Sequence, residues 1–219
     1  MFRFLLSVAS AAVIACEVLA SPIALSLPQP GPVILVLGPP GSGKTVNAKK
    51  ISGRYGIPAI SMSDLLKEAG GWGKAGSRKT LRAPIESGDL LSDEVSVQLL
   101  DQRLGKSDAN KGFVLDGFPL SAGQADHLES VSRERGFREP IVVHLAVSDS
   151  TATQRMLKRR RADDKPETIE RRLAEYHAQA KLVLERYPQV VTIEATGTPD
   201  EVWTRVEQAL DTLLPDRGR

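Results

Sequence analysis

The stretch Gly38-Pro39-Pro40-Gly41-Ser42-Gly43-Lys44-Thr45 matches the phosphate-binding loop pattern G-x-x-x-x-G-K-[ST] at every specified position. The apolar run Val33 to Leu37 precedes it as a predicted buried strand, and the residues after it, through Tyr55, can form a helix. Glycines let backbone N–H groups wrap a phosphate chain, the lysine supplies a point charge, and the threonine hydroxyl can reach a magnesium ion. The stretch therefore predicts a nucleoside triphosphate site. The alternative, a glycine-rich turn that matches by chance, is disfavoured by the strand before it and the helix after it.

A chain of 219 residues, 41% hydrophobic and 26% charged, is long enough for one α/β domain with a substantial core. Its formal charge of +2 is too small to indicate a nucleic-acid partner. Basic residues nevertheless concentrate in one segment, which suits a small polyanion as ligand. They are Arg155, Lys158, Arg159, Arg160 and Arg161. A solvated helix end, basic because the C-terminus of a helix favours cations, is the alternative interpretation.

The first twenty residues are predicted to be an export signal, because Arg3 is followed by an apolar stretch, residues 4–14, that is too short to span a membrane comfortably. Two endings stay open: cleavage after Ala20, or lipidation of Cys16 in a segment that resembles a bacterial lipoprotein box. An uncleaved membrane tether also stays open. Cys16 is the only cysteine, so the rest of the chain offers no disulfide, thiolate–zinc site or thiol catalysis.

The chain divides into four predicted segments. Residues 1–20 are the signal, and residues 21–32, which contain four prolines, form an extended linker. Residues 33–214 form the phosphate-loop domain, and residues 215–219 form a tail.

Apolar runs alternate with helical patterns along residues 33–214. After the first strand and helix, strands are predicted at 57–62, 113–116, 141–147 and 190–193, and helices after Ser63, at 92–104, from Ser121 toward Gly136, at 151–160, at 167–187 and from Thr198 to 213. This alternation predicts a three-layer α/β/α fold of the P-loop type, with a mostly parallel sheet covered by helices on both faces. Ligands are then expected at the carboxyl ends of the strands.

Local signals refine these boundaries. Ser63 is a predicted helix cap, and a cluster of glycines between residues 70 and 76 predicts a break in regular structure and a surface loop. Two pairs have the spacing of a capping box, in which a hydroxyl and a side chain three positions later each bond the other's backbone. They are Ser121 with Gln124 and Thr198 with Glu201.

Asp116 ends the predicted strand Phe113-Val114-Leu115-Asp116. A carboxylate at this position can organise a magnesium ion beside the phosphate loop of an open α/β sheet. The alternative is an aspartate that only stabilises a turn after the strand.

These residues resemble the adenylate kinase family of nucleoside monophosphate kinases over nearly all of residues 33–213. The shared motifs occur in family order. They are Gly-x-Pro-Gly-Ser-Gly-Lys at 38–44, Asp64-Leu65-Leu66, Ser92-Asp93-Glu94, Leu115-Asp116-Gly117-Phe118-Pro119, Gln124-Ala125-Asp126, Asp163-Asp164, and Glu167-Thr168 to Arg172-Leu173.

The resemblance implies reversible transfer of the terminal phosphoryl group of magnesium ATP to a nucleoside monophosphate, with AMP as the first candidate. It assigns ATP binding to Gly41, Ser42, Gly43, Lys44, Thr45, Arg155, Arg159 and Gly197, with Arg155 and Gly197 near the donor base. It assigns catalysis to Lys44, Asp116, Arg159, Arg161 and Arg172, and magnesium to Thr45 and, through water, Asp116. It assigns acceptor binding to Met62, Lys67, Leu91, Gly117, Gln124, Arg161 and Arg172.

The chain departs from the family mainly on the acceptor side. Met62 replaces a threonine, and Lys67 and Leu120 each replace an arginine. The lid is very short, because Arg160 and Arg161 are adjacent where the family inserts one. After the lysine, Thr45-Val46-Asn47 replaces the usual Gly-Thr-Gln, which moves the hydroxyl by one position.

These departures leave a second interpretation open: an ATP-binding sensor or pseudokinase with little transferase activity. By either interpretation we expect nucleotides as ligands and a monomeric protein. The predicted signal indicates an exported or membrane-anchored protein, and the family default, the cytoplasm, is the alternative.

Overall fold

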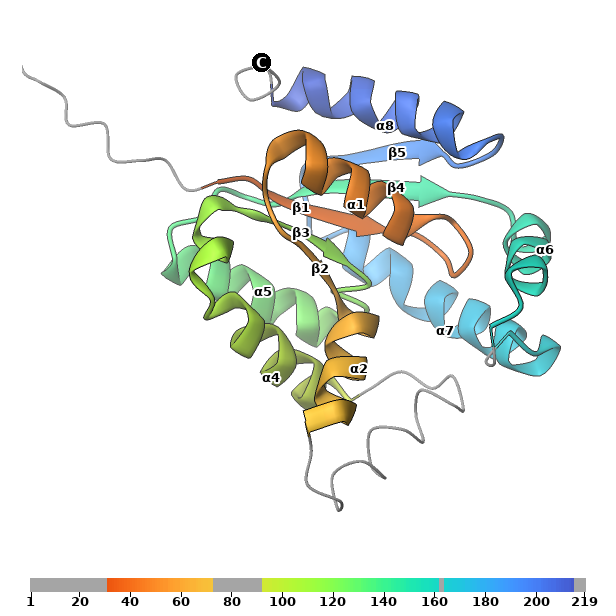
Figure 1. Cartoon of the computed structure of the whole chain (residues 1–219), viewed down its shortest axis with the longest axis horizontal. Helices are drawn as coiled ribbons and strands as arrows, with labels where there is room; N and C mark the ends of the chain where they lie inside the picture. The colour runs from red at the N-terminus through yellow and green to blue at the C-terminus, as the bar shows by residue number, and fades with distance from the viewer. Residues whose placement is uncertain (1–30, 73–91, 162–163, 215–219) are drawn as a thin grey trace, which may run out of the picture.

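The structure is a computed structural model that describes residues 31–72, 92–161 and 164–214 (Figure 1). Its described strands form one parallel sheet in the order β2-β3-β1-β4-β5. The strands are β1 (Val33–Leu37), β2 (Ala59–Ser61), β3 (Phe113–Asp116), β4 (Ile141–Ala146) and β5 (Val190–Glu194). The described helices are α1 (Lys44–Tyr55), α2 (Met62–Trp72), α4 (Asp93–Leu104), α5 (Ala122–Glu134), α6 (Asp149–Arg159), α7 (Pro166–Leu184) and α8 (Pro199–Leu213), with a short 3₁₀ helix η1 (Ser107–Lys111).

The central strand β1 is buried on both sides and organises two hydrophobic cores. Successive side chains of a strand point to opposite faces, so Val33 and Leu35 contribute to one core and Ile34 and Val36 to the other. The first core contains residues of α4, α5 and α7, and the second contains residues of α1 and α8. Figure 1 shows α1 and α8 on one face of the sheet and α4, α5 and α7 on the other. The predicted three-layer α/β/α fold is confirmed.

The helix after β2 differs from the prediction. It begins at Met62, directly after the strand, so Ser63 lies inside the helix and does not cap it. It also continues through Gly70 and Gly71 to Trp72, where the sequence predicted a break. A glycine costs a helix only about 1 kcal/mol, which tertiary packing can offset, and α2 packs against α4. The remaining predicted loop glycines lie outside the described residues.

The two predicted capping boxes have different outcomes. At the start of α8 the box is complete, because Glu201 N donates to Thr198 Oγ1 at 3.3 Å and Thr198 N donates to Glu201 Oε2 at 2.8 Å. At the start of α5, Gln124 N donates to Ser121 Oγ at 3.1 Å, but the Gln124 side chain does not return the bond to Ser121. Instead its Oε1 atom accepts from the backbone N–H of Leu120 at 2.7 Å. The sequence signal located the cap but not the use of the glutamine.

The predicted signal, most of the linker and the tail lie outside the described residues and stay predictions. Within the described segments, no helix is both long enough and apolar enough to cross a membrane.

Candidate active site

The phosphate loop lies between the end of β1 and the start of α1, and its shape requires glycine. Gly41 has a φ of 82° and Gly43 a φ of 95°, a left-handed conformation that side chains disfavour. A Cβ added at Gly41 would also lie 2.6 Å from the carbonyl oxygen of Ala152 in α6. The loop therefore passes against α6 at a distance that only glycine permits, and α6 carries some of the predicted arginines.

Lys44 reaches back across the loop that precedes it. Its Nζ atom donates to the carbonyl oxygens of Gly38 at 2.8 Å and Pro39 at 2.9 Å. Burial lowers the pKa of the Lys44 ammonium to about 8; the Asp116 carboxylate acts in the opposite direction, and the Arg159 charge lowers the pKa further. The ammonium is therefore surrounded by the backbone expected to carry the phosphates.

Thr45 and Asp116 meet at the carboxyl ends of the strands. Thr45 Oγ1 donates to Asp116 Oδ2 at 2.5 Å, although the two residues are 71 positions apart in the chain. Asp116 is 5% exposed and lies in register with Val36 of β1 and Ser61 of β2. A hydroxyl and a carboxylate in contact are the hard oxygen donors that magnesium prefers, with further positions filled by phosphate oxygens and water. This donor set fits the predicted ion.

Two buried oxygen atoms beside the loop have no hydrogen-bond partner among the described residues. They are Ser42 Oγ and Asn47 Oδ1. The other side-chain atom of that asparagine is used, because Asn47 Nδ2 donates to the carbonyl oxygen of Gly43 at 3.1 Å. Unsatisfied buried polar atoms cost roughly 1–3 kcal/mol each, so their presence at a glycine-rich loop is typical of a ligand site.

The predicted arginines are carried by α6, α7 and the short connection between them. The two helices pack through buried apolar side chains at Ala152, Met156, Ile169 and Leu173. Arg155 on α6 donates to the carbonyl oxygen of Gly197 at 3.4 Å, so the two residues assigned to the donor base are in contact. Arg172 lies on α7 and is partly buried.

Asp164 makes several hydrogen bonds beside the connection between α6 and α7. Arg159 donates to it with two nitrogens, Nε to Oδ2 at 2.8 Å and Nη2 to Oδ1 at 2.7 Å. The backbone N–H of Arg161 also donates to Oδ2 at 2.9 Å. The hydrogen bonds from Arg159 hold the pKa of the Asp164 carboxyl below its usual range. One carboxylate thereby brings together two of the arginines predicted to contact the nucleotides, a role that the sequence analysis did not predict.

Apart from Arg161 and Arg172, the predicted acceptor residues that the structure describes lie on the β2–β3 side of the sheet. Met62 is buried at the start of α2, and Gly117, with a φ of 77°, follows Asp116. Lys67 is exposed, and its Nζ atom donates to Asp64 Oδ1 at 2.8 Å within the same helix. Leu91 lies outside the described residues.

Gln124 is the most enclosed of the predicted acceptor residues, at 3% exposed. Its Nε2 atom donates to Asp93 Oδ1 at 2.9 Å, in addition to the contact of its Oε1 atom with Leu120 N–H. Asp93 belongs to the Ser92-Asp93-Glu94 motif, and no sequence signal indicates this contact, because the two residues are 31 positions apart on different helices.

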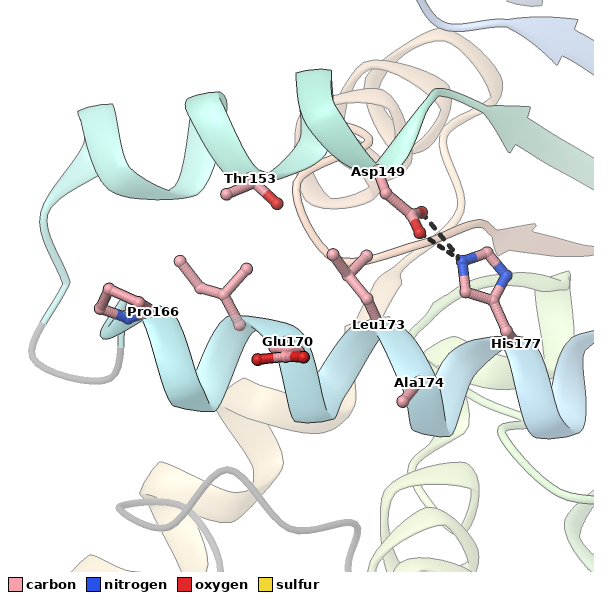
Figure 2. Close-up of a pocket in the computed structure, with 8 residues that line it drawn as sticks. Asp149, Thr153, Pro166, Glu170, Leu173, Ala174 and His177 are labelled. Carbon is pink, nitrogen blue, oxygen red and sulfur yellow. Dashed lines mark hydrogen bonds and ion pairs between the residues drawn. The ribbon is translucent and has the colours of Figure 1, made fainter.

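A shallow groove of about 450 Å³ lies between α6 and α7 and is separate from these residues. Figure 2 shows its lining, with Asp149 and His177 joined at one end by contacts of 2.9 and 3.0 Å. Leu173 and Ile169 of α7 also line it, and none of the predicted site residues does.

Comparison with known proteins decides the family. The family model described as adenylate kinase matches residues 36–192. The chain belongs to the adenylate kinase family. Membership of this family makes the chain a phosphotransferase, as the sequence motifs predicted.

The named relatives match over most of their length. An adenylate kinase of Mycobacteroides abscessus is 40% identical over 180 residues, which cover 81% of this chain and 98% of that protein. An adenylate kinase of Corynebacterium glutamicum is 38% identical over 178 residues, with 81% and 98% covered. One from Micrococcus luteus is 36% identical over 196 residues, with 84% and 93% covered. The family match begins at residue 36, so it does not bear on the predicted signal.

Proposed function

We propose that this adenylate kinase family member transfers the terminal phosphoryl group of magnesium ATP to a nucleoside monophosphate, with AMP as the principal acceptor. The observation that carries the proposal is the contact between Thr45 and Asp116 beside the glycine-rich loop that encloses Lys44. It places a cation, a hydroxyl and a carboxylate around one position at the carboxyl ends of the strands. The named relatives support the same reaction.

The donor is proposed to bind along the loop. The backbone N–H groups of residues 41–45 and the N-terminus of α1 offer positive potential to the phosphates. Lys44 would exchange its two carbonyl contacts for phosphate oxygens. Arg155 and Gly197, which are already in contact, would lie beside the donor base.

Magnesium is proposed to bind with the nucleotide at Thr45 and, through water, at Asp116. Bound there, the ion would neutralise charge on the β- and γ-phosphates and fix their geometry. The hydroxyl of Thr45 would then keep one contact with the carboxylate or exchange it for the ion.

The transferring phosphoryl group is proposed to be stabilised by Arg159, Arg161 and Arg172. A loose phosphoryl-transfer transition state spreads negative charge over its oxygens, and it needs positioned cations more than a general base. Guanidinium groups suit this because their forked N–H donors match phosphate oxygens. Asp164 holds the guanidinium of Arg159 and the backbone of Arg161 in one cluster, so the Arg159 side chain and the Arg161 backbone are fixed before any nucleotide binds.

The acceptor is proposed to bind on the β2–β3 side, with its base near Gln124 and Gly117.

A second candidate function, an ATP-binding sensor with little transferase activity, is favoured by one observation. Leu120 offers no cation, and Lys67 is paired with Asp64, so these two described positions present little positive charge to an acceptor phosphate.

Phosphoryl transfer from ATP, assayed across a panel of nucleoside monophosphates, separates the two functions. We expect transfer to AMP by the wild-type protein and none by Lys44→Ala, because the ammonium is needed at the phosphates. The loss of a charged hydrogen bond is worth at least about 1.5–3 kcal/mol, and more in the transition state. Circular dichroism of Lys44→Ala serves as the folding control. ATP binding by the wild-type protein without transfer to any monophosphate would support the sensor instead.

We propose two alternative cellular locations. The apolar stretch after Arg3 favours export or membrane attachment, and kinship with adenylate kinases favours the cytoplasm. Fractionation of the native cell separates them: full-length, unprocessed protein in the cytosol would rule out export. The expected monomeric state can be measured by light scattering.

A further inference from the structure

Asp93 has no part in the proposed chemistry, yet it is hydrogen-bonded to Gln124, the side chain that we assign to the acceptor base. Its Oδ1 atom accepts from Gln124 Nε2 at 2.9 Å, and its Oδ2 atom accepts from Ser121 Oγ at 2.7 Å. A Cβ added at Gly123 would lie 2.8 Å from the same Oδ2 atom. The carboxylate at the start of α4 thus fits closely against the first turn of α5.

The other end of the Gln124 carboxamide is fixed as well. Its Oε1 atom accepts from the backbone N–H of Leu120 at 2.7 Å, and the residue is only 3% exposed, so few water molecules reach these bonds. A flipped carboxamide would set its NH₂ group against the Leu120 N–H and its oxygen against the Asp93 carboxylate. Both pairs repel. Asp93 and the Leu120 N–H therefore select one orientation of the side chain.

That orientation decides which base the carboxamide can recognise. A primary amide has two N–H donors and two acceptor lone pairs, and the contacts with Asp93 and Leu120 use one of each. The second donor and the second lone pair can address a base. Adenine offers an acceptor at N1 and a donor at its 6-amino group, whereas a 6-oxopurine offers a donor at N1 and an acceptor at position 6. The two bases require opposite orientations of the same carboxamide.

We propose that Asp93 is a positioning residue that makes the acceptor site selective for a 6-aminopurine nucleoside monophosphate over its 6-oxopurine counterpart. It acts through Gln124 and does not touch the substrate. The inference rests on the proposed function, since base selectivity has meaning only if the protein transfers phosphoryl groups to a nucleotide acceptor.

The test compares full-length wild-type protein with Asp93→Asn, with ATP as donor and either AMP or IMP as acceptor. These two acceptors differ only in the pattern at N1 and position 6. A carboxamide at position 93 can accept from the native Gln124 orientation or donate to the flipped one. We expect the ratio of kcat/KM for AMP to that for IMP to fall about tenfold, the effect of one charged hydrogen bond. The KM for ATP should stay unchanged.

Ser121→Ala is the matched control, because it removes the cap of α5 and the second contact of Asp93 but leaves both contacts of the Gln124 side chain. It should lower Tm and leave the AMP to IMP ratio unchanged. Asp93→Ser removes the carboxylate and keeps a residue favoured in a first helical turn. It should lower the ratio of kcat/KM for AMP to that for IMP, as Asp93→Asn does. This second variant keeps the test decisive if the first does not fold.

The outcomes separate the inference from the proposed function. A wild-type protein that phosphorylates AMP, with the same AMP to IMP ratio in both Asp93 variants, would show that Asp93 only ties α4 to α5. The inference would then be wrong and the proposed function would stand. A wild-type protein that binds ATP and phosphorylates neither acceptor nor any other monophosphate would overturn both.

Discussion

At the scale of single residues, Lys44 has an unusual environment for a lysine. Its ammonium donates to two carbonyl oxygens of its own loop, and burial lowers its pKa from 10.5 to about 8. The unfolded chain therefore binds more protons at this residue between these two pH values, so its contribution to folding stability rises with pH across that window. Nucleotide binding instead requires the protonated ammonium, because its positive charge attracts the phosphate chain.

We predict that ATP affinity begins to fall as the pH rises through about 8, although an ordinary lysine would stay charged to above pH 10. Binding at pH 8.5 should also take up protons, since the phosphates favour the ammonium. Calorimetry in buffers of different ionisation enthalpy measures both effects. The control is Lys44→Arg, whose guanidinium stays charged throughout, so its affinity should not show this decline. A flat pH profile to pH 10 for the wild-type protein would contradict the prediction.

Thr45 gives a second prediction at this scale, on magnesium. Because its hydroxyl contacts Asp116 at 2.5 Å, Thr45→Val should remove one oxygen donor and leave the shape of the loop nearly unchanged. We expect the magnesium concentration needed for half-maximal stabilisation by ATP to rise about tenfold, which corresponds to the loss of one charge-assisted contact. Thermal unfolding with ATP and a magnesium titration provides the measurement.

Thr45→Ser is the matched control, because it keeps the hydroxyl and should behave as the wild-type protein does. Equal magnesium requirements for Thr45→Val and Thr45→Ser would show that the hydroxyl takes no part in metal binding.

At the scale of elements, the start of α8 offers a clean test of helix capping. Both hydrogen bonds of the box between Thr198 and Glu201 are present, and α8 covers one face of the sheet. We predict that Thr198→Ala lowers the free energy of unfolding by about 1 kcal/mol. Urea denaturation should show a lower midpoint at an unchanged slope. Thr204→Ala is the control, since it removes a threonine within the same helix whose hydroxyl bonds only the carbonyl oxygen of Asp200. Equal destabilisation by the two variants would contradict a capping effect.

The sequence predicts a helix or strand boundary well where neighbouring residues set it, and poorly where tertiary packing sets it. Strands such as β1 and β3 follow from runs of apolar residues, and the cap at Thr198 follows from a spacing of three residues. The continuation of α2 through Gly70 and Gly71 to Trp72 could not be predicted in this way, because the packing of α2 against α4 offsets the cost of these glycines. A boundary set by tertiary packing leaves little local signal.

The same distinction applies to the site. The loop at residues 38–45 and Asp116 are recognisable because their backbone context is local. The contact of Asp93 with Gln124 depends on how two separate helices fold together, and the sequence did not indicate it. The contact of Asp164 with Arg159 spans only five positions, but no motif spacing indicated it.

At the scale of the whole molecule, the order of the strands divides the proposed site into two sides around β1. Of the predicted acceptor residues, Met62, Lys67, Gly117 and Gln124 lie on the side of β2, β3, α2 and α5. The predicted arginines, which include the acceptor residues Arg161 and Arg172, lie on the side of β4, β5, α6 and α7. In the proposed function the acceptor phosphate would lie between the two sides to receive the phosphoryl group. Its negative charge would then be shared by two parts of the fold, and Leu120 offers no cation on the acceptor side.

Leu120→Arg tests whether the arginine side alone suffices for the acceptor phosphate. A guanidinium at this position could give that phosphate a bidentate contact, and such a charged contact is worth roughly 1.5–3 kcal/mol. We therefore predict that kcat/KM for AMP rises about ten- to a hundredfold in this variant, from slow but measurable transfer in the wild-type protein. ATP affinity should stay nearly unchanged, because the donor site lies on the other side of the transferring phosphoryl group. The contact between the Leu120 backbone N–H and Gln124 does not depend on the side chain, so base selectivity should also be kept.

Leu120→Met, which conserves volume without adding charge, is the matched control and should leave AMP turnover at the wild-type rate. Flat AMP turnover in a Leu120→Arg protein with an unchanged Tm would mean that the acceptor phosphate does not pass this residue, and would favour a different acceptor or the ATP-binding sensor.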